Sequence, residues 1–83
     1  MRFAYFYFMT DDPDRVRRFA PDHAAYWHEL HLDGYQGGPF ADRSGGLIVF
    51  TAESVDRANR LVTEDPFVRH GLLESRWVKQ WNA

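Results

Sequence analysis

The chain has 83 residues, no cysteine and a formal net charge of −2. Its length predicts one domain over residues 1–83, because a second domain would be too small to bury its own core, and the lack of cysteine excludes disulfides and thiolate metal sites. Since the only basic cluster is formed by Arg15, Arg17 and Arg18, nucleic acids and anionic membranes are disfavoured as partners.

The first predicted strand, residues 2–10, is apolar on both of its faces. It is rich in Phe and Tyr, which favour strands, and Asp11-Asp12-Pro13 ends it. Alternation places two sets of side chains on opposite faces: Phe3, Tyr5, Tyr7 and Met9, and Ala4, Phe6 and Phe8. The chain's own helices can cover one face. The other face is expected to be covered by a second copy of the chain, in a homodimer or a higher oligomer.

The same apolar stretch could instead be a targeting or membrane-spanning segment. It is too short to span a membrane, and it lacks the small-residue cleavage site of a signal peptide. We therefore expect the stretch to be a strand of a soluble, cytoplasmic protein.

A turn and then the main helix are predicted next. Asp12-Pro13 is an N-cap followed by proline at the first helical position, and this turn runs through Arg18. Pro21 is expected to restart the chain as a helix that runs to about Leu32, with Gly34 as its terminator. Three side chains of this helix share one face, at intervals of four and three residues: His23, Trp27 and Leu30.

The remaining elements complete an alternation of strands and helices. In chain order they are an edge strand at 35–40, a hairpin loop at 41–46, a central strand at 46–51, a helix at 55–64 capped by Ser54, a turn at 66–70 and a last strand at 74–81. The order β-α-β-β-α-β predicts the ferredoxin-like α+β fold, a four-stranded antiparallel sheet with two helices on one face.

This topology brings His23 and Asp65 to the same end of the helical layer, although they are far apart in the sequence. A carboxylate beside an imidazole favours its charged form and fixes its tautomer, so the pair is a candidate for general acid/base chemistry. Asp65 followed by Pro66 is equally explained as an N-cap of the turn at 66–70. Both interpretations of Asp65 stay open, and His23 has the structural alternative of packing against Trp27.

Five motifs follow one another along nearly the whole chain: His23 with Tyr26, Trp27 and Leu30; Gly38-Pro39-Phe40 with Asp42; Gly45-Gly46 before an apolar strand; Asp65-Pro66-Phe67-Val68 with Gly71-Leu72; and Trp81. Together they resemble the YciI-like (YCII-related) proteins. The resemblance implies a dimeric α/β barrel and a His-Asp dyad, carried here by His23 and Asp65. One branch of that family implies a dehydrochlorinase that acts on a chlorinated hydroxyhydroquinone without a metal or organic cofactor.

The chain departs from the family pattern at two positions. Ala20 stands where an arginine is frequent, and Trp27 stands where leucine is commoner. The bulky indole is expected to narrow the pocket, so the substrate of that branch is not carried over to this chain.

Candidate pocket residues come from the aromatic side chains and from the hairpin: Tyr5, Tyr7, Trp27, Phe40, Asp42 and Ser44. Aromatic rings of this kind suit a phenolic substrate, although they are more often simply core residues. Asp42 and Ser44 could reach the rim of a pocket, but such residues normally serve the turn itself. His28 and His31 do not match a metal-binding signature, and no cofactor motif is present, so we predict neither a metal nor a cofactor.

Two classes of function follow from these features. In the first, His23 is the general base of an elimination or isomerisation on a small, ring-containing substrate, and Asp65 orients its imidazole. In the second, the chain is a non-catalytic homodimer that binds a small ligand or acts as a scaffold, and both residues are structural.

Overall fold

Four strands and three helices follow one another in the computed structural model, which describes residues 1–83. In chain order they are β1 Arg2–Met9, α1 Pro13–Glu29, β2 Gln36–Pro39, β3 Gly45–Thr51, α2 Val55–Thr63, α3 Pro66–Arg69 and β4 Leu73–Gln80. All four predicted strands are present, and none of their ends differs from the prediction by more than one residue. None of the helices combines the length and the hydropathy needed to cross a membrane.

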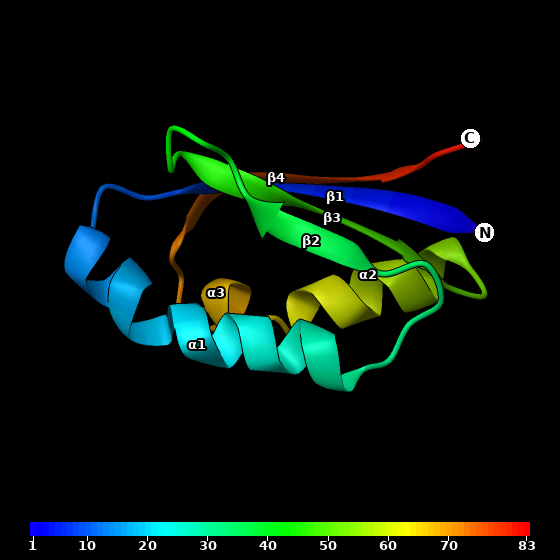
Figure 1. Cartoon of the computed structure of the whole chain (residues 1–83), viewed down its shortest axis with the longest axis horizontal. Helices are drawn as coiled ribbons and strands as arrows, with labels where there is room; N and C mark the ends of the chain where they lie inside the picture. The colour runs from blue at the N-terminus through cyan, green and yellow to red at the C-terminus, as the bar shows by residue number, and fades with distance from the viewer.

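The strands form one sheet in the order β2-β3-β1-β4, and every neighbouring pair is antiparallel. The short strand β2 lies at the edge, as its glycines and proline predicted, and β1 and β3 are central. All three helices lie on the same side of the sheet (Figure 1). The ferredoxin-like α+β fold is therefore confirmed, with α3 as an additional single turn before β4.

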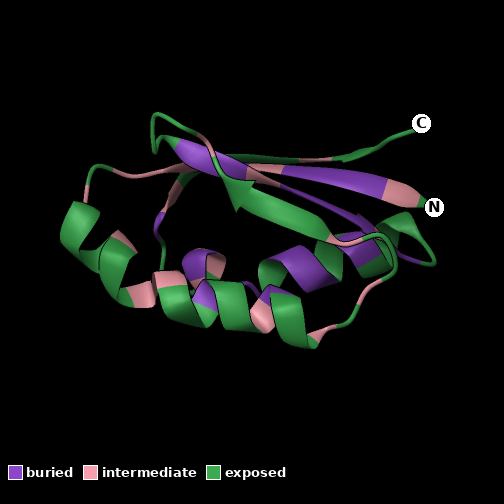
Figure 2. Ribbon diagram, in the orientation of Figure 1, coloured by how far each residue is buried: buried purple, intermediate pink, exposed green.

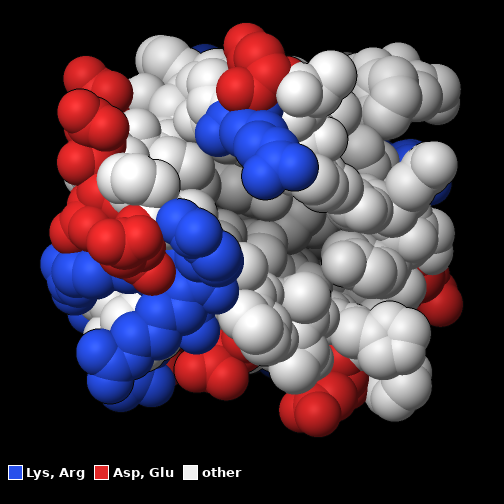
Figure 3. Space-filling view, turned by 60° about the vertical axis from the view of Figure 1, so that its left-hand side comes forward, with Lys and Arg blue, Asp and Glu red and all other residues white.

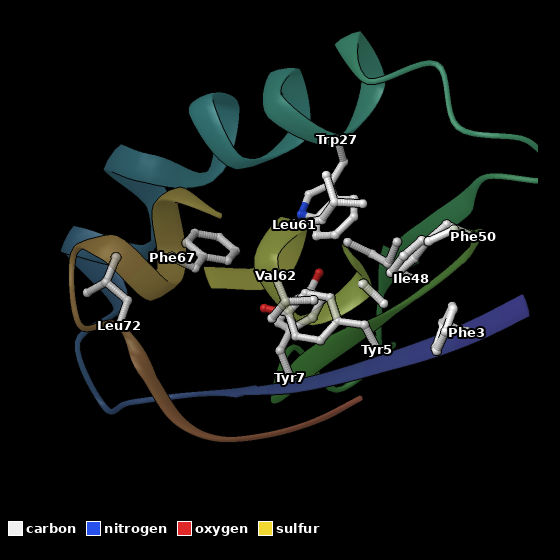
Figure 4. Packing of buried hydrophobic residues seen from close by; sticks show 12 residues of the cluster. Phe3, Tyr5, Tyr7, Trp27, Ile48, Phe50, Leu61, Val62, Phe67 and Leu72 are labelled. Atoms are coloured by element: carbon white, nitrogen blue, oxygen red, sulfur yellow. The ribbon is translucent and has the colours of Figure 1, made fainter. Parts of the chain in front are cut away.

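The core lies between the sheet and the helices. In the register of the sheet, Tyr5 of β1 lies opposite Ile48 of β3 and Val78 of β4, so these side chains point to the helical side. Figure 2 shows the buried residues gathered along β1 and on the inner sides of the helices. Figure 4 shows Trp27 reaching from α1 toward Tyr5 and Tyr7, which project from β1. This aromatic layer positions the site described below.

Helix α1 differs from the prediction at both ends. A single helix runs from Pro13 to Glu29 with Pro21 in its interior, so the expected restart at Pro21 is wrong. The fixed φ of proline lies within the helical range, and the helix continues at the cost of the one hydrogen bond that its missing N–H would have donated. The helix ends earlier than Leu32 because His31 adopts a left-handed conformation with φ 49°.

The sheet face opposite the helices is also apolar. The register places Phe6 of β1 between Leu47 of β3 and Trp77 of β4 on this face, with Phe8 beside them. Phe8 contacts the Trp77 ring edge-on, with ring centroids 5.7 Å apart, and Trp77 is 50% exposed. No element of the chain covers this face (Figure 1).

Candidate active site

Asp65 is a buried carboxylate at the junction of α2 and α3. It is the N-cap of α3, where its Oδ1 accepts a hydrogen bond of 2.9 Å from the backbone N–H of Phe67. Pro66 follows at the first helical position, which explains why the chain turns into α3 at this point. The side chain of Asp65 is 0% exposed, so each of its oxygens needs partners within the protein.

Four donors surround this carboxylate. Its Oδ1 also accepts a hydrogen bond of 2.8 Å from Nδ1 of His23, in addition to the capping bond. Its Oδ2 accepts hydrogen bonds from the Tyr5 hydroxyl at 3.1 Å and from the indole N–H of Trp27 at 3.0 Å. The indole and the backbone N–H can only donate, so both oxygens must accept, as they do in an ionised carboxylate. Asp65 therefore caps α3 and pairs with His23 at the same time.

His23 is held in a single orientation by aromatic rings. Its imidazole stacks on Phe67, with ring centroids 4.1 Å apart and an angle of 15° between the planes, and it contacts Tyr7 at 5.2 Å. Because Nδ1 faces the carboxylate of Asp65, the hydrogen-bond pattern assigns the ring proton to Nδ1 and leaves the lone pair on Nε2. An imidazole in this tautomer can accept a proton at Nε2.

A cavity of about 650 Å³ opens on His23, between α1 and the β2–β3 hairpin. Its lining is largely apolar and includes Tyr7, Met9, Val16, Ala20, Tyr35, Phe40, Arg43, Ile48 and Phe67. Figure 3 shows the molecule hollowed on this side, with Lys or Arg side chains on two sides of the hollow. A cavity of this size and composition matches the usual properties of small-molecule sites.

Tyr7 presents its hydroxyl in this cavity, above the backbone of β3. Gly46 lies opposite Tyr7 in the sheet, and a Cβ at this position would collide with the Tyr7 hydroxyl, so only glycine leaves room for it. Burial raises the pKa of Tyr7 to about 12, and the charge of Asp65 and the nearby Tyr35 act in the same direction. The hydroxyl therefore stays protonated and available as a donor near neutral pH.

Apart from Asp65, which is buried behind His23 and does not line the cavity, the predicted site residues fall into three groups. Tyr7, Phe40 and His23 line the cavity. Tyr5 and Trp27 do not line it, because both are fully buried and contact Asp65 instead, so the indole does not narrow the pocket as expected.

Asp42 and Ser44 form the third group. They were expected at the rim of the pocket, but neither of them lines it. Oδ1 of Asp42 accepts hydrogen bonds from the backbone N–H of Ser44 at 3.0 Å and from its hydroxyl at 2.7 Å, which lowers the pKa of Asp42. Both residues thus serve the turn, and the residue between them, Arg43, lines the cavity. Arg43 and Tyr35 were missed because turn chemistry and strand pattern do not indicate which side chains reach a cavity.

The other histidines lie away from the cavity. His28 and His31 are exposed near the end of α1, and His70 stacks on Phe19, with ring centroids 3.9 Å apart. None of them contributes to the site of His23.

The buried tyrosines predict a fall in stability at alkaline pH. Burial also raises the pKa of Tyr5, and the charge and hydrogen bond of Asp65 add to the effect. Above about pH 10 the unfolded chain loses these protons while the folded chain keeps them, so the free energy of unfolding should decrease by about 1.4 kcal/mol per pH unit for each such tyrosine. Urea denaturation at about pH 8, 10 and 11 measures this slope. The slope should be smaller in Tyr7→Phe, and an unchanged slope in that variant would contradict the assignment.

Sequence comparisons find two matches that cover most of the chain. The profile of the YCII-related domain matches residues 1–82. The uncharacterised protein YjpA of Bacillus subtilis (strain 168) is 34% identical, in an alignment that covers 81% of this chain and 85% of YjpA.

Solved structures with the same fold include an enzyme. The 5-chloro-2-hydroxyhydroquinone dehydrochlorinase TftG of Burkholderia phenoliruptrix AC1100, in complex with 2,5-dihydroxybenzoquinone, superposes with a TM-score of 0.82 at 26% identity, covering 99% of this chain and 94% of TftG. A mutant of the cofactor-independent oxygenase SnoaB of Streptomyces nogalater has a TM-score of 0.51 at 12% identity, with 99% and 92% of the two chains covered. Rv0793 of Mycobacterium tuberculosis has a TM-score of 0.62 at 14% identity, with 100% and 97% covered. The last two are alike in fold alone.

Proposed function

The chain belongs to the YCII-related domain family, and we propose that it is a cofactor-independent enzyme in which His23 is the general base toward a small ring compound. The observation that carries this proposal is the 2.8 Å contact between His23 Nδ1 and the buried Asp65, at the wall of a largely apolar cavity. Asp65 fixes the tautomer of His23 through Nδ1, and Nε2 is left for a ligand in the cavity. This is the arrangement that a general base needs for proton abstraction.

The reaction class that fits is elimination or isomerisation. His23 Nε2 takes a proton from a hydroxyl or a carbon of the substrate, and the released electron pair forms a new π bond. In an elimination, the leaving group departs with the electron pair of its own bond, so the substrate loses HX overall and no external oxidant or reductant is needed. In an isomerisation, the imidazolium returns the proton to another atom. Asp65 stabilises the imidazolium that forms in both cases.

The likeness to TftG supports a ring substrate. TftG is described as a dehydrochlorinase of a chlorinated hydroxyhydroquinone, and at 26% identity its structure matches almost the whole of this chain. Tyr7 and Phe67 both contact His23 and line the cavity beside it, which gives this part of the wall an aromatic character that suits a ring.

A panel of halogenated and unhalogenated hydroxyhydroquinones and hydroxyquinones tests the proposal. Loss of halide is followed with a halide electrode, isomerisation by the ultraviolet spectrum, and binding by calorimetry. We expect turnover of at least one ring compound that disappears when His23 is replaced. Binding without any turnover across the panel would contradict an enzymatic role.

The second candidate is a non-catalytic, ligand-binding dimer. It is favoured by the structural role of Asp65, which caps α3 and satisfies the buried polar groups of Tyr5 and Trp27 whether or not a reaction takes place. The same panel separates the two candidates, since the ligand-binding dimer predicts affinity for a ring compound with no product.

The proposal includes a homodimer in which two sheets face each other. Its support is the uncovered apolar face formed by Phe6, Phe8, Leu47 and Trp77, because apolar patches of this kind on a sheet mark protein interfaces. A second copy would bury this face and complete a barrel of two sheets.

Replacing Trp77 with glutamate is expected to convert the dimer to a monomer, because it places a charge at the centre of the buried interface. Light scattering should give twice the chain mass of 9.8 kDa for the wild type and about 9.8 kDa for Trp77→Glu. Val55→Glu is the matched control, since Val55 on α2 is 47% exposed, close to the 50% of Trp77, but lies on the helical side. A monomeric wild type, or a dimeric Trp77→Glu, would overturn this part of the proposal.

A further inference from the structure

Arg43 is the only Lys, Arg, Asp or Glu side chain that lines the cavity of His23. We propose that it is the binding residue for an anionic group, so that the ligand of this cavity is an anionic ring compound. The anionic group would be a carboxylate or an ionised hydroxyl conjugated to a ring carbonyl. This inference rests on the proposed function for the choice of cavity, and it adds the charge of the ligand and its orientation.

The β2–β3 hairpin holds Arg43 in an unusual conformation. Its φ is 64°, in the left-handed region that glycine or asparagine adopts more readily. The backbone is fixed there by a hydrogen bond of 2.9 Å from the Arg43 N–H to the Phe40 carbonyl, and by the side chain of Asp42, which binds Ser44. Turn chemistry alone would favour glycine at this position, so the arginine needs another explanation. Backbone strain of this kind is frequent at ligand sites.

The guanidinium of Arg43 is free to bind a ligand. It forms none of the four ion pairs of the chain, which involve Arg15, Arg17, His23 and Arg69. Arg43 also lines a second, adjoining hollow of about 420 Å³, whose lining includes Arg17 and one carboxylate, Asp11. Arg43 therefore lies where the apolar cavity meets a more polar hollow.

The α1 side and the hairpin side of the cavity differ in charge, and this orients the ligand. Behind His23, on the α1 side, lies the carboxylate of Asp65, which disfavours a second anion there. On the hairpin side the planar guanidinium of Arg43 can bind a carboxylate or an enolate oxygen with two parallel hydrogen bonds. A ring bound in the cavity thus has its anionic group toward Arg43 and the proton to be removed toward His23.

Matched ligand pairs test this inference by calorimetry, without any need for turnover. The first pair is 4-hydroxybenzoate and its neutral amide, 4-hydroxybenzamide. The second is 2,5-dihydroxybenzoquinone, which is ionised at neutral pH, and its neutral dimethyl ether. In the wild type we expect the anionic member of at least one pair to bind about 10- to 100-fold more tightly than the neutral one, as for a charge-assisted hydrogen bond. The pair that shows the preference identifies the anionic group as a carboxylate or an ionised hydroxyl.

Three variants assign the preference to Arg43. Arg43→Gln should bind both members of a pair equally, and Arg43→Lys should keep part of the preference. Arg43→Gly removes the guanidinium and suits the positive φ, so its melting temperature should not fall although the preference is lost. Arg60→Gln, which removes an exposed arginine of α2 outside both hollows, is the control and should behave as the wild type.

Several outcomes would overturn the inference: equal binding of the two members by the wild type, no binding of either, or a preference that survives in Arg43→Gln. These outcomes leave the proposed function testable by itself, because turnover that depends on His23 does not require an anionic ligand. Conversely, a preference lost in Arg43→Gln together with no turnover on any ring compound would contradict the enzymatic role and support the anion site.

Discussion

Turnover should fall by about 10²- to 10⁴-fold when His23 is replaced with alanine, which is the usual contribution of a positioned general base. The reason is that His23 is the only histidine that lines the cavity, and no Asp or Glu side chain lines it. The measurement is kcat/KM on the ring compound with the highest wild-type turnover. The loss should lie in kcat, because the ring of the substrate still contacts Tyr7 and Phe67.

Two further variants separate chemistry from folding. The amide of His23→Asn can still donate a hydrogen bond to Asp65, as Nδ1 does in the wild type, but it offers no basic nitrogen to the cavity. This variant should therefore be as inactive as His23→Ala. It should unfold at nearly the same urea concentration as the wild type. His28→Ala removes an exposed histidine of the same helix and should retain full activity. Activity in His23→Asn close to that of the wild type would rule out His23 as the base.

Alanine at position 65 is expected to lower the free energy of unfolding by about 3–5 kcal/mol, because it leaves buried donors without acceptors. The donors are the N–H groups of His23, Trp27 and Phe67 and the hydroxyl of Tyr5. Loss of an N-cap alone costs only about 1 kcal/mol. Urea denaturation followed by tryptophan fluorescence measures the difference, and a decrease near 1 kcal/mol would show that Asp65 acts only as a cap.

Tyr5→Phe is the matched control for this prediction. It removes one of the four donors and leaves Oδ2 of Asp65 bonded to Trp27, so stability should decrease by only about 1 kcal/mol. A Tyr5→Phe variant as unstable as Asp65→Ala would mean that the packing of the tyrosine, not the carboxylate, carries the effect.

The sequence was sufficient to predict the sheet and the meeting of His23 with Asp65. Alternation and turn residues identify strands locally, and the β-α-β-β-α-β order sets the directions of the two helices and the layer they share. The expected position of His23 at the start of its helix was wrong, because α1 already begins at Pro13, but the two residues still meet. The buried face of α1, with His23 and Trp27, could also be predicted from helical spacing. Topology thus predicted that His23 and Asp65 lie close together, and the structure adds the hydrogen bond between them, which the sequence left open.

Other features depended on tertiary contacts that spacing does not encode. The helical spacing of the sequence predicted that Trp27 lies on the inner face of its helix. It could not show that the indole N–H donates to Asp65, away from the cavity. Helix α1 continues through Pro21 because the packing of the helix before and after the proline outweighs the loss of one hydrogen bond. Local sequence rules do not measure this balance. Arg43 was overlooked because the residues beside it have an obvious role in the turn.

The partners of Asp65 lie 60, 42 and 38 positions away in the sequence, at Tyr5, His23 and Trp27. A substitution of this carboxylate therefore lowers the stability of the fold. Selection for stability would eliminate such a variant before a new activity could arise. The loop at 41–44 that bears Arg43 has exposed side chains, and surface loops tolerate substitutions and changes in length better than the core does. In evolution, proteins built on this plan would thus keep the pair of His23 and Asp65 and vary the lining of the cavity through the hairpin.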